Sequence, residues 1–518
     1  MNPIKVILGV AAVIIVFHLA RWGWQEWQLA QPGFHETAFW FSKQVTGDAT
    51  CGYLVVRENR QAVDSRTIRL PVVIFAAEPV DRWKPSPAKE PILYLTGGPG
   101  GSAYLSEQRH VDSWWLERRI FPKGRDLIVM GQRGTGLKEP DFDCEEFDSL
   151  AIVLEAHARG APPPDIRALT VAAAVACAER LQAEGIDLTA YNSRESAADI
   201  AELRVALNIE EWNLYGVSYG TRLALSVLRY QPEGIRTVIL DSVFPPEATH
   251  LIDGAAFYRT ALRRFLTGCI DRAPCEPPPD GLWAQYLQVH EQLRQRPVEV
   301  DLSAIDPNVE LVTTIDHRRL DELLFGALYS SETRPLIEPA LRGLADAVSA
   351  PQERSTARHG EAMLRNLLEG TLEAWSDGSE AVSLSHVCRD EAPFDSPAAI
   401  AAAAAEAGPL AHLITQDVNG QLCPVWPSGE ADAVENTPVE SEVPALLLAG
   451  ILDPVTPPDL ARSAAENLGN SHVFEFLHAG HGVIYEVDCA GSLISEFLDH
   501  PRQRPKGDCR RSHLFSLQ

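Results

Sequence analysis

Motifs that would hold a metal ion or contact a nucleic acid are missing from this sequence. The 518 residues include nine cysteines, but no two of them have the two-residue spacing of a zinc-binding pair, and no His-Glu-x-x-His motif occurs. Both patterns are common in zinc sites, so we predict no metal site and no cofactor. Basic residues are also few: 45 Lys and Arg stand against 71 Asp and Glu, a net charge of −26. A nucleic-acid surface needs basic residues to neutralise phosphates, so we predict no nucleic-acid partner.

One long apolar run is present, from Val6 to Ala20, and only His18 interrupts it. It would span about 22 Å as a helix, less than the roughly 30 Å of a membrane's hydrocarbon core. Three tryptophans of the kind found at membrane interfaces follow it: Trp22, Trp24 and Trp27. We interpret residues 1–30 as an uncleaved membrane anchor, because the small residues of a cleavage site are scarce. A cleaved signal peptide is the alternative, and a buried cytosolic helix is a third.

The stretch Gly216-Val217-Ser218-Tyr219-Gly220 is the strongest chemical signal in the chain. An apolar segment, residues 212–215, precedes it and predicts a strand, and a helical pattern over residues 221–228 follows it. A serine between two glycines on a sharp strand-to-helix turn is the nucleophile elbow of an α/β-hydrolase. We therefore predict that Ser218 is a nucleophile.

A serine nucleophile needs a base, and the base needs an acid that orients it. In this fold the order along the chain is serine, acid, histidine. Asp453 follows the apolar strand predicted over residues 443–450, and His481 lies between two glycines after the strand predicted over residues 472–477. We predict a triad of Ser218, Asp453 and His481, with His478 as the competing base.

The oxyanion of an acyl-transfer reaction needs backbone donors. One is the amide of the residue after the nucleophile, Tyr219, and the other comes from the loop after an early strand. Residues 91–95 predict that strand, and a glycine-rich loop follows it, in which the amide of Gly98 is our candidate. After a further strand over residues 126–130, Arg133 is predicted to form an internal ion pair.

Ser218 and Asp453 are 235 residues apart, far more than the core needs between them. We therefore expect an α/β-hydrolase fold with a mostly parallel central sheet and a large, mainly helical cap insertion over residues 245–438. The core would comprise residues 31–244 and 439–518. Apolar residues three or four apart predict cap helices over residues 255–267, 283–295, 320–329 and 359–372, and the alanine-rich run 398–405 predicts another.

Several loops together resemble the proline iminopeptidase and tripeptidyl aminopeptidase family of serine peptidases, in particular its secreted tripeptidyl-aminopeptidase-like branch. The matching segments are residues 97–101, 132–136, 216–221, 241–243, 453–457 and 480–482. Two positions depart from the pattern: Thr96 stands where many relatives carry histidine, and Gly131 where they carry aspartate. The resemblance implies the same triad, and peptides as substrates.

Aminopeptidase action also needs a carboxylate that recognises the substrate's free amine. The resemblance and their position after Cys388 make Asp390 and Glu391 our candidates. The alternative is that both are ordinary surface carboxylates.

The nine cysteines are compatible with an oxidising compartment. We expect the disulfides Cys269–Cys275 and Cys489–Cys509, and also Cys144–Cys177 and Cys388–Cys423, which would leave Cys51 unpaired; spacing alone does not determine connectivity. With the N-terminal segment, this predicts an extracytoplasmic protein of the periplasm or cell envelope.

We therefore predict a serine exopeptidase that releases short peptides or single residues from peptide N-termini through an acyl-enzyme. A carboxylesterase with the same triad is the first alternative. A non-catalytic, membrane-tethered binding protein is the second, although such a role would not require all three triad residues.

Overall fold

The computed structural model describes residues 30–41, 48–79, 88–137, 140–147, 165–268, 281–301, 312–349, 378–507 and 509. The predicted N-terminal anchor, the helix predicted over residues 359–372 and the cysteines Cys269 and Cys275 lie outside these ranges. Within them, no helix combines the length and apolar character needed to cross a membrane.

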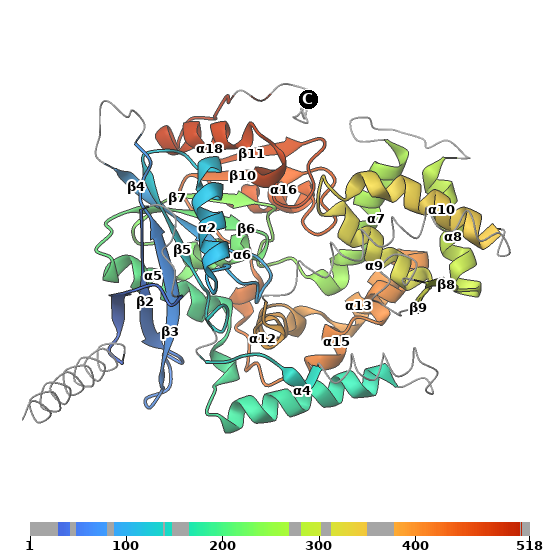
Figure 1. The fold of residues 1–518 in the computed structure, drawn as a ribbon, viewed down its shortest axis with the longest axis horizontal. Coiled ribbons are helices and arrows are strands. Elements are labelled where there is room, and N and C mark those ends of the chain that lie inside the picture. The colour runs from blue at the N-terminus through green and yellow to red at the C-terminus, as the bar shows by residue number, and fades with distance from the viewer. Residues whose placement is uncertain are drawn as a thin grey trace, which may run out of the picture.

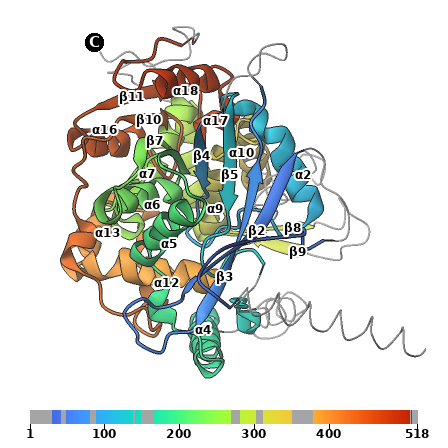
Figure 2. The ribbon, with the colours of Figure 1, turned by 90° about the vertical axis from the view of Figure 1, so that its left-hand side faces the viewer.

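One sheet of nine strands organises the described chain (Figures 1 and 2), in the order β1-β2-β3-β5-β4-β6-β7-β10-β11. The strands are β1 (Gly33–Thr37), β2 (Ala49–Arg57), β3 (Thr67–Phe75), β4 (Lys89–Leu95), β5 (Arg125–Met130), β6 (Trp212–Val217), β7 (Ile235–Asp241), β10 (Ala445–Gly450) and β11 (Ser471–Phe476). In this order, the pairings β1-β2, β2-β3 and β3-β5 are antiparallel. All pairings from β5-β4 to β10-β11 are parallel. This is the mostly parallel sheet of an α/β-hydrolase.

Both faces of the sheet are covered, which explains why its central strands are apolar throughout. The helices around it are α2 (Gln108–Glu117), α5 (Ser193–Ala206), α6 (Tyr219–Tyr230), α16 (Pro458–Glu466), α17 (Val483–Glu486) and α18 (Ala490–Asp499). Helix α4 (Ile166–Ala183) packs in a separate hydrophobic core away from the sheet (Figure 1). Leu214 of β6 packs in one core with Leu223 of α6, and the next residue, Tyr215, packs in the opposite core with Phe497 of α18. Side chains alternate across a strand, so β6 is buried on both sides.

Between β7 and β10 the chain forms a separate, mainly helical body beside the sheet (Figure 1). Its elements are α7 (His250–Thr267), α8 (Leu282–Gln295), β8 (Val298–Asp301), β9 (Val312–Ile315), α9 (His317–Leu328), α10 (Ile337–Ser349), α12 (Glu380–Asp390), α13 (Pro397–Ala407), α14 (His412–Thr415) and α15 (Asn419–Leu422). Helices α7, α8, α9 and α10 share one hydrophobic core of their own. We call the residues from α7 to α15 the cap; the domain limits 245 and 438 stay a prediction.

Four of the described cap helices were predicted, whereas α10, α12, α14 and α15 were not. The helices expected over residues 255–267, 283–295, 320–329 and 398–405 correspond to α7, α8, α9 and α13. The apolar spacing identified the helices, but the ends moved by up to five residues, because caps such as Asp316 and Ser396 lie outside the apolar pattern.

Three of the expected disulfides are present: Cys144–Cys177, Cys388–Cys423 and Cys489–Cys509. Cys51 is a free, buried cysteine in β2. Burial raises the pKa of its thiol to about 11, so it stays protonated.

Arg133 forms the internal ion pair that the sequence predicts. Its guanidinium is fully buried and donates to both carboxylate oxygens of Asp199 on α5, at 2.8 and 2.7 Å. The pair joins the loop after β5 to the helix that precedes β6, and so supports the strand that carries Ser218.

Candidate active site

Ser218 lies at the turn between β6 and α6, with φ of 58° and ψ of −126°. A positive φ is strained for a serine and is typical of this turn. Close packing around this turn explains why glycine flanks the serine on both sides. A Cβ on Gly220 would overlap the carbonyl oxygen of Leu95, and a Cβ on Gly216 would overlap the carbonyl oxygen of Gly220. The chain can therefore make this turn only with glycine at both positions.

Asp453 and His481 lie beyond the carboxyl ends of β10 and β11, the edge at which Ser218 follows β6. In parallel sheets this edge is where ligands bind. His481 Nδ1 donates to Asp453 Oδ2 at 2.9 Å, and Asp453 is fully buried. The competing base, His478, is exposed, and its carbonyl oxygen accepts from Arg334 at 3.1 Å.

Asp453 is oriented by the turn that follows it. Its Oδ1 accepts from the amides of Val455 and Thr456, both at 2.9 Å, and its Oδ2 accepts from the Thr456 hydroxyl at 2.7 Å. The same hydroxyl oxygen lies 3.3 Å from His481 Nδ1. The sequence analysis missed Thr456, although the Asp-x-x-Thr spacing of a carboxylate capping its own turn was visible.

The charges of this pair reinforce each other. Burial alone would raise the pKa of Asp453, but His481 and the hydrogen bonds from Thr456 lower it to about 2. Burial alone would lower the pKa of His481, but Asp453, with Asp241 and Glu486 farther away, raises it above the ordinary value of 6.5. The imidazolium that forms when this histidine accepts a proton is thus stabilised.

Asp241 and Ser242 link the serine turn to the histidine loop. The carbonyl oxygen of Asp241 accepts from the Ser218 amide at 3.0 Å. The carboxylate of Asp241 accepts from the amides of Val483 and Ile484, at 2.8 and 2.9 Å, and Ser242 Oγ accepts from Gly482 at 2.8 Å. These bonds hold the loop of His481 against the strand end that carries Ser218.

The cap holds the histidine loop from the other side. Tyr329, which follows α9, packs its ring on His481 with centroids 4.9 Å apart and accepts from the His481 amide at 3.2 Å. Arg334 forms a buried ion pair with Glu486 at 2.6 Å, and Glu486 also accepts from the amide of Gly480. None of these cap contacts had a signal in the sequence.

The glycine-rich loop after β4 lies against Ser218. A Cβ on Gly97 would come within 2.9 Å of the Ser218 Cβ and 3.4 Å of its Oγ. Gly98, our oxyanion candidate, is the next residue and has φ of 121°. Gln132 donates to the carbonyl oxygen of Thr96 at 2.9 Å and so fixes the start of the loop. The other candidate, Tyr219, is the first residue of α6, where helix amides lack intrahelical partners.

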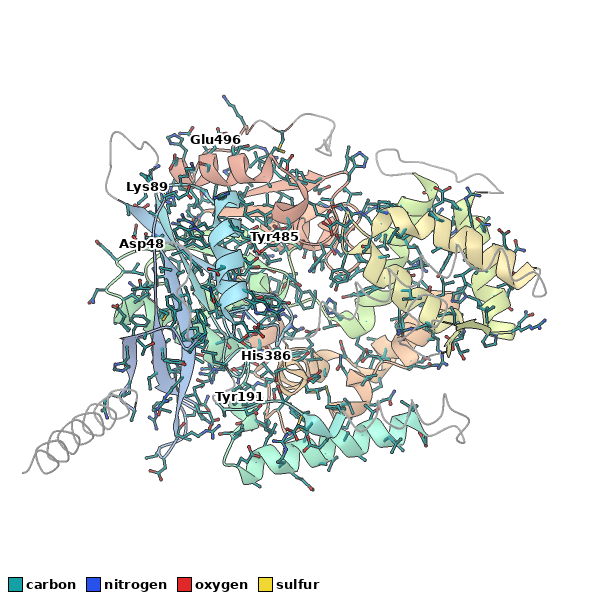
Figure 3. All side chains as sticks on the ribbon, viewed as in Figure 1. Asp48, Lys89, Tyr191, His386, Tyr485 and Glu496 are labelled. Atoms are coloured by element: carbon teal, nitrogen blue, oxygen red, sulfur yellow. A yellow bond between two sulfur atoms is a disulfide. The ribbon has the colours of Figure 1, made fainter. Side chains whose placement is uncertain are left out.

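Asp390 lies behind Tyr219. Its Oδ2 accepts from the Ser193 hydroxyl at 2.6 Å and lies 3.2 Å from Nδ1 of His386. Figure 3 labels His386, which lies on α12. Because the Ser193 proton is committed to Asp390, the Tyr219 hydroxyl donates to Ser193 Oγ across 2.9 Å. Asp390 is therefore part of an internal network that positions Tyr219.

Glu391 contacts a different helix, α6. It forms a buried ion pair with Arg222 of α6 at 3.2 Å, and it accepts from the amide of His250 at 3.1 Å. Burial lowers the pKa of His250, on which the charges of Glu391, His481 and Asp453 all act.

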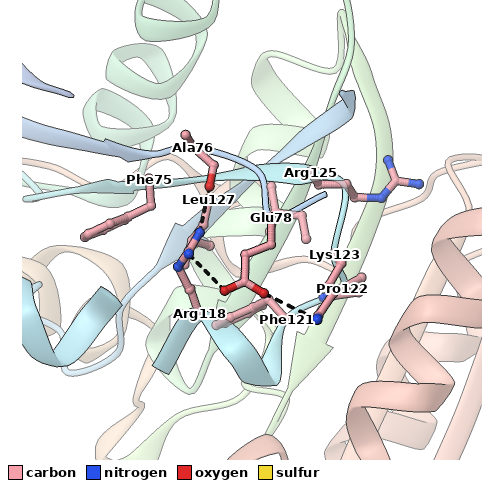
Figure 4. A pocket seen from close by; sticks show the side chains of 10 residues that line it. Phe75, Ala76, Glu78, Arg118, Phe121, Pro122, Lys123, Arg125 and Leu127 are labelled. Carbon is pink, nitrogen blue, oxygen red and sulfur yellow. Dashed lines mark hydrogen bonds and ion pairs between the residues drawn. The ribbon is translucent and has the colours of Figure 1, made fainter. Parts of the chain in front are cut away.

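A pocket beside β3 and β5 contains none of the predicted site residues. Glu78 pairs there with Arg118 at 2.9 Å and with Lys123 at 3.5 Å (Figure 4). Since its charges satisfy each other, we assign this pocket no role.

The chain is also similar to known proteins, through one segment and over most of its length. Residues 409–509 match the family model described as "TAP-like protein". The chain is similar to members of the proline iminopeptidase and tripeptidyl aminopeptidase family of α/β-hydrolases. It is a peptidase-like serine hydrolase, and the matched segment contains both Asp453 and His481.

The relatives match to different extents. The chain is 21% identical to serine protease Hip1 of Mycobacterium tuberculosis over 479 residues, which cover 90% of this chain and 88% of the relative. It is 27% identical to a tripeptidyl aminopeptidase of Streptomyces lividans over 38% of this chain and 35% of the relative. Among solved structures, a proline iminopeptidase-related protein from Thermus thermophilus matches 87% of this chain and 97% of its own, at 17% identity and a TM-score of 0.36.

Proposed function

We propose that the protein is a serine exopeptidase that removes short peptides or single residues from peptide N-termini. The observation that carries the proposal is the His481–Asp453 hydrogen bond at the sheet edge where the strained Ser218 lies. A buried acid that orients a histidine beside a nucleophile elbow is the arrangement that serine acyl transfer requires.

In the proposed reaction, Ser218 Oγ attacks the scissile carbonyl while His481 Nε2 takes its proton. Asp453 accepts from His481 Nδ1 and stabilises the imidazolium. The amides of Gly98 and Tyr219 donate to the oxyanion, and His481 then protonates the leaving amine. Water, activated by the same histidine, releases the acyl group and regenerates the Ser218 hydroxyl.

We further propose that the free amine of the substrate is recognised by a group of cap carboxylates around Glu391. The other members are Asp253, Asp395 and Asp417. Burial and the charges of Glu391, Asp253 and Asp417 raise the pKa of Asp395 to about 6, although a hydrogen bond from Thr249 acts in the opposite direction. A protonated amine would relieve this repulsion. Asp390, the other candidate, is proposed to position Tyr219 instead.

We also propose an extracytoplasmic location. Three disulfides are typical of proteins that fold in an oxidising compartment. The attachment of the chain to a membrane through residues 1–30 remains part of this proposal.

The first experiment is covalent labelling with a fluorophosphonate. We expect the native chain to be labelled and the Ser218→Ala variant, folded to the same extent, to remain unlabelled. Equal labelling of both would mean that another residue reacts and would overturn the assignment of Ser218.

The second experiment compares aminoacyl- and tripeptidyl-arylamides with their N-acetylated forms and with simple esters. We expect the native protein to cleave only the substrates with a free amine. The KM for these substrates should rise at least tenfold in the variants Asp395→Asn and Glu391→Gln. Equal cleavage of acetylated substrates would exclude aminopeptidase action, and cleavage of esters alone would favour a carboxylesterase.

A further inference from the structure

A cluster of three histidines and one aspartate lies inside the cap. His290 is on α8, His317 and Asp321 are on α9, and His412 begins α14. Asp321 and His290 are buried, and only 9% of the His412 side chain is exposed. Neither the proposed reaction nor the proposed amine recognition uses any of them.

The atoms of this cluster converge on one carboxylate oxygen. Asp321 Oδ2 lies 3.0 Å from His290 Nε2 and 3.3 Å from His412 Nε2, and these three atoms all lie within 4.8 Å of one another. Two nitrogens and an oxygen bound to one tetrahedral ion at 2.0–2.2 Å would be about 3.3 Å apart. The cluster therefore already has nearly the dimensions of a metal site.

The second oxygen of the carboxylate is held separately. Asp321 Oδ1 accepts from the hydroxyls of Tyr286, at 2.6 Å, and Tyr258, at 3.1 Å. Such outer hydrogen bonds orient a ligating carboxylate and leave its other oxygen for the metal.

The orientation of His412 directs one ring nitrogen at the carboxylate. Its Nδ1 lies 3.3 Å from the carbonyl oxygen of Pro409, which can only accept. The other nitrogen, Nε2, lies 3.3 Å from Asp321 Oδ2. These two atoms are therefore placed to share one cation.

His317 completes the group. Its ring centroid lies 5.1 Å from that of His290 and 5.0 Å from that of His412, and its buried Nδ1 has no hydrogen-bond partner in the described chain. It is one helical turn before Asp321 on α9, so both residues face the same side of the helix.

We propose that His290, Asp321 and His412 bind a divalent transition-metal ion, zinc by the chemistry of its ligands, with His317 beside the fourth position. Imidazole nitrogens and a carboxylate are ligands that zinc accepts in tetrahedral sites. The ion would join α8, α9 and α14, and α9 leads directly to Tyr329, which packs against His481. The other close group of ligand atoms, around Cys144 and Cys177, has no free thiolate, because these cysteines form a disulfide.

The test uses the purified full-length chain, stripped with a chelator, dialysed, and titrated with Zn²⁺ or Co²⁺. We expect one ion per chain, a visible Co²⁺ absorption of tetrahedral intensity, and a higher Tm with Zn²⁺. The variant His412→Gln, which keeps a polar side chain of similar size, should lose at least about 100-fold in affinity. The variant His290→Gln should lose metal affinity to a similar extent.

The matched control is His472→Gln. His472 also has a buried Nε2 without a hydrogen-bond partner in the described chain, but it lies on β11, packed against Phe497. The His472→Gln variant should bind zinc with the same affinity as the native chain. Equal zinc binding by the native chain and by folded His412→Gln, or no binding by either, would overturn the proposal. These readouts need no substrate, so they stand apart from the proposed peptidase activity.

Discussion

Tyr329 packs its ring against the imidazole of His481, with the two centroids 4.9 Å apart, and its carbonyl oxygen accepts from the His481 amide at 3.2 Å. Tyr329 belongs to the cap and His481 to the loop after β11 of the core. The proposed catalytic base is therefore held by both parts of the chain, and its position depends on how the cap is folded.

Tyr329→Ala should lower kcat/KM about tenfold, because an aromatic contact of this kind contributes about 0.5–1.5 kcal/mol. Tyr329→Phe keeps the ring and the carbonyl oxygen and should stay within about twofold of the native rate. Steady-state kinetics on an arylamide substrate measures both. Equal loss in the two variants would mean that the hydroxyl, and not the ring, is important.

Gly220→Ala should unfold or inactivate the protein. The added Cβ would overlap the carbonyl oxygen of Leu95, and overpacking of this kind costs about 1–3 kcal/mol or more. Gly254→Ala is the control: it lies on α7, where nothing is within 4 Å of an added Cβ, and it should be neutral or up to about 1 kcal/mol stabilising. Thermal unfolding and fluorophosphonate labelling report the difference, and a fully active Gly220→Ala would contradict the elbow geometry.

The pH profile should reveal the raised pKa of His481. Because only the neutral imidazole can accept the Ser218 proton, kcat/KM should fall as the pH drops, with an apparent pKa above the ordinary 6.5. Asp453→Asn removes the charge that raises this pKa, so the acid limb should move to lower pH while kcat falls about 10⁴-fold.

Asp459→Asn is the control for this profile, since Asp459 lies exposed on α16 and should leave both the limb and the rate unchanged. An acid limb at or below 6.5 in the native protein would show that another group controls the rate.

Arg334→Met should destabilise the histidine loop. The Arg334 and Glu486 side chains are only 5% and 6% exposed, and removal of one partner from a buried pair costs about 3–5 kcal/mol. Arg342→Met breaks the exposed pair with Glu338 on α10 and should change the free energy of unfolding by about 0.5 kcal/mol or less. Denaturant unfolding compares the two, and similar losses would contradict the assigned role of Arg334.

Much of the site was predictable because its signals are local. The glycines around Ser218 and the apolar strands before Asp453 and His481 are short patterns, and parallel strands bring their carboxyl ends to one edge whatever the rest of the chain does. The apolar spacing of α7, α8 and α9 also allowed these cap helices to be predicted, since it reflects one buried face, whereas α10 and α12 were not predicted.

The partners of Asp390 and Glu391 were not predictable in the same way. Both follow Cys388 at the end of α12, yet one contacts Ser193 and the other Arg222. These contacts join segments far apart in the chain, and only the packing of α12 against α5 and α6 decides which carboxylate faces which helix.

The sequence by itself determined the fold class, the order of the proposed triad and the existence of a helical cap, because backbone turns and hydrophobic periodicity are properties of neighbouring residues. Only the folded chain shows that Thr456 holds Asp453, that Tyr329 and Arg334 hold the loop of His481, and that His290 and His412 meet at Asp321. Each of these depends on side chains from separate elements meeting at distances of a few ångströms, and no local pattern encodes that.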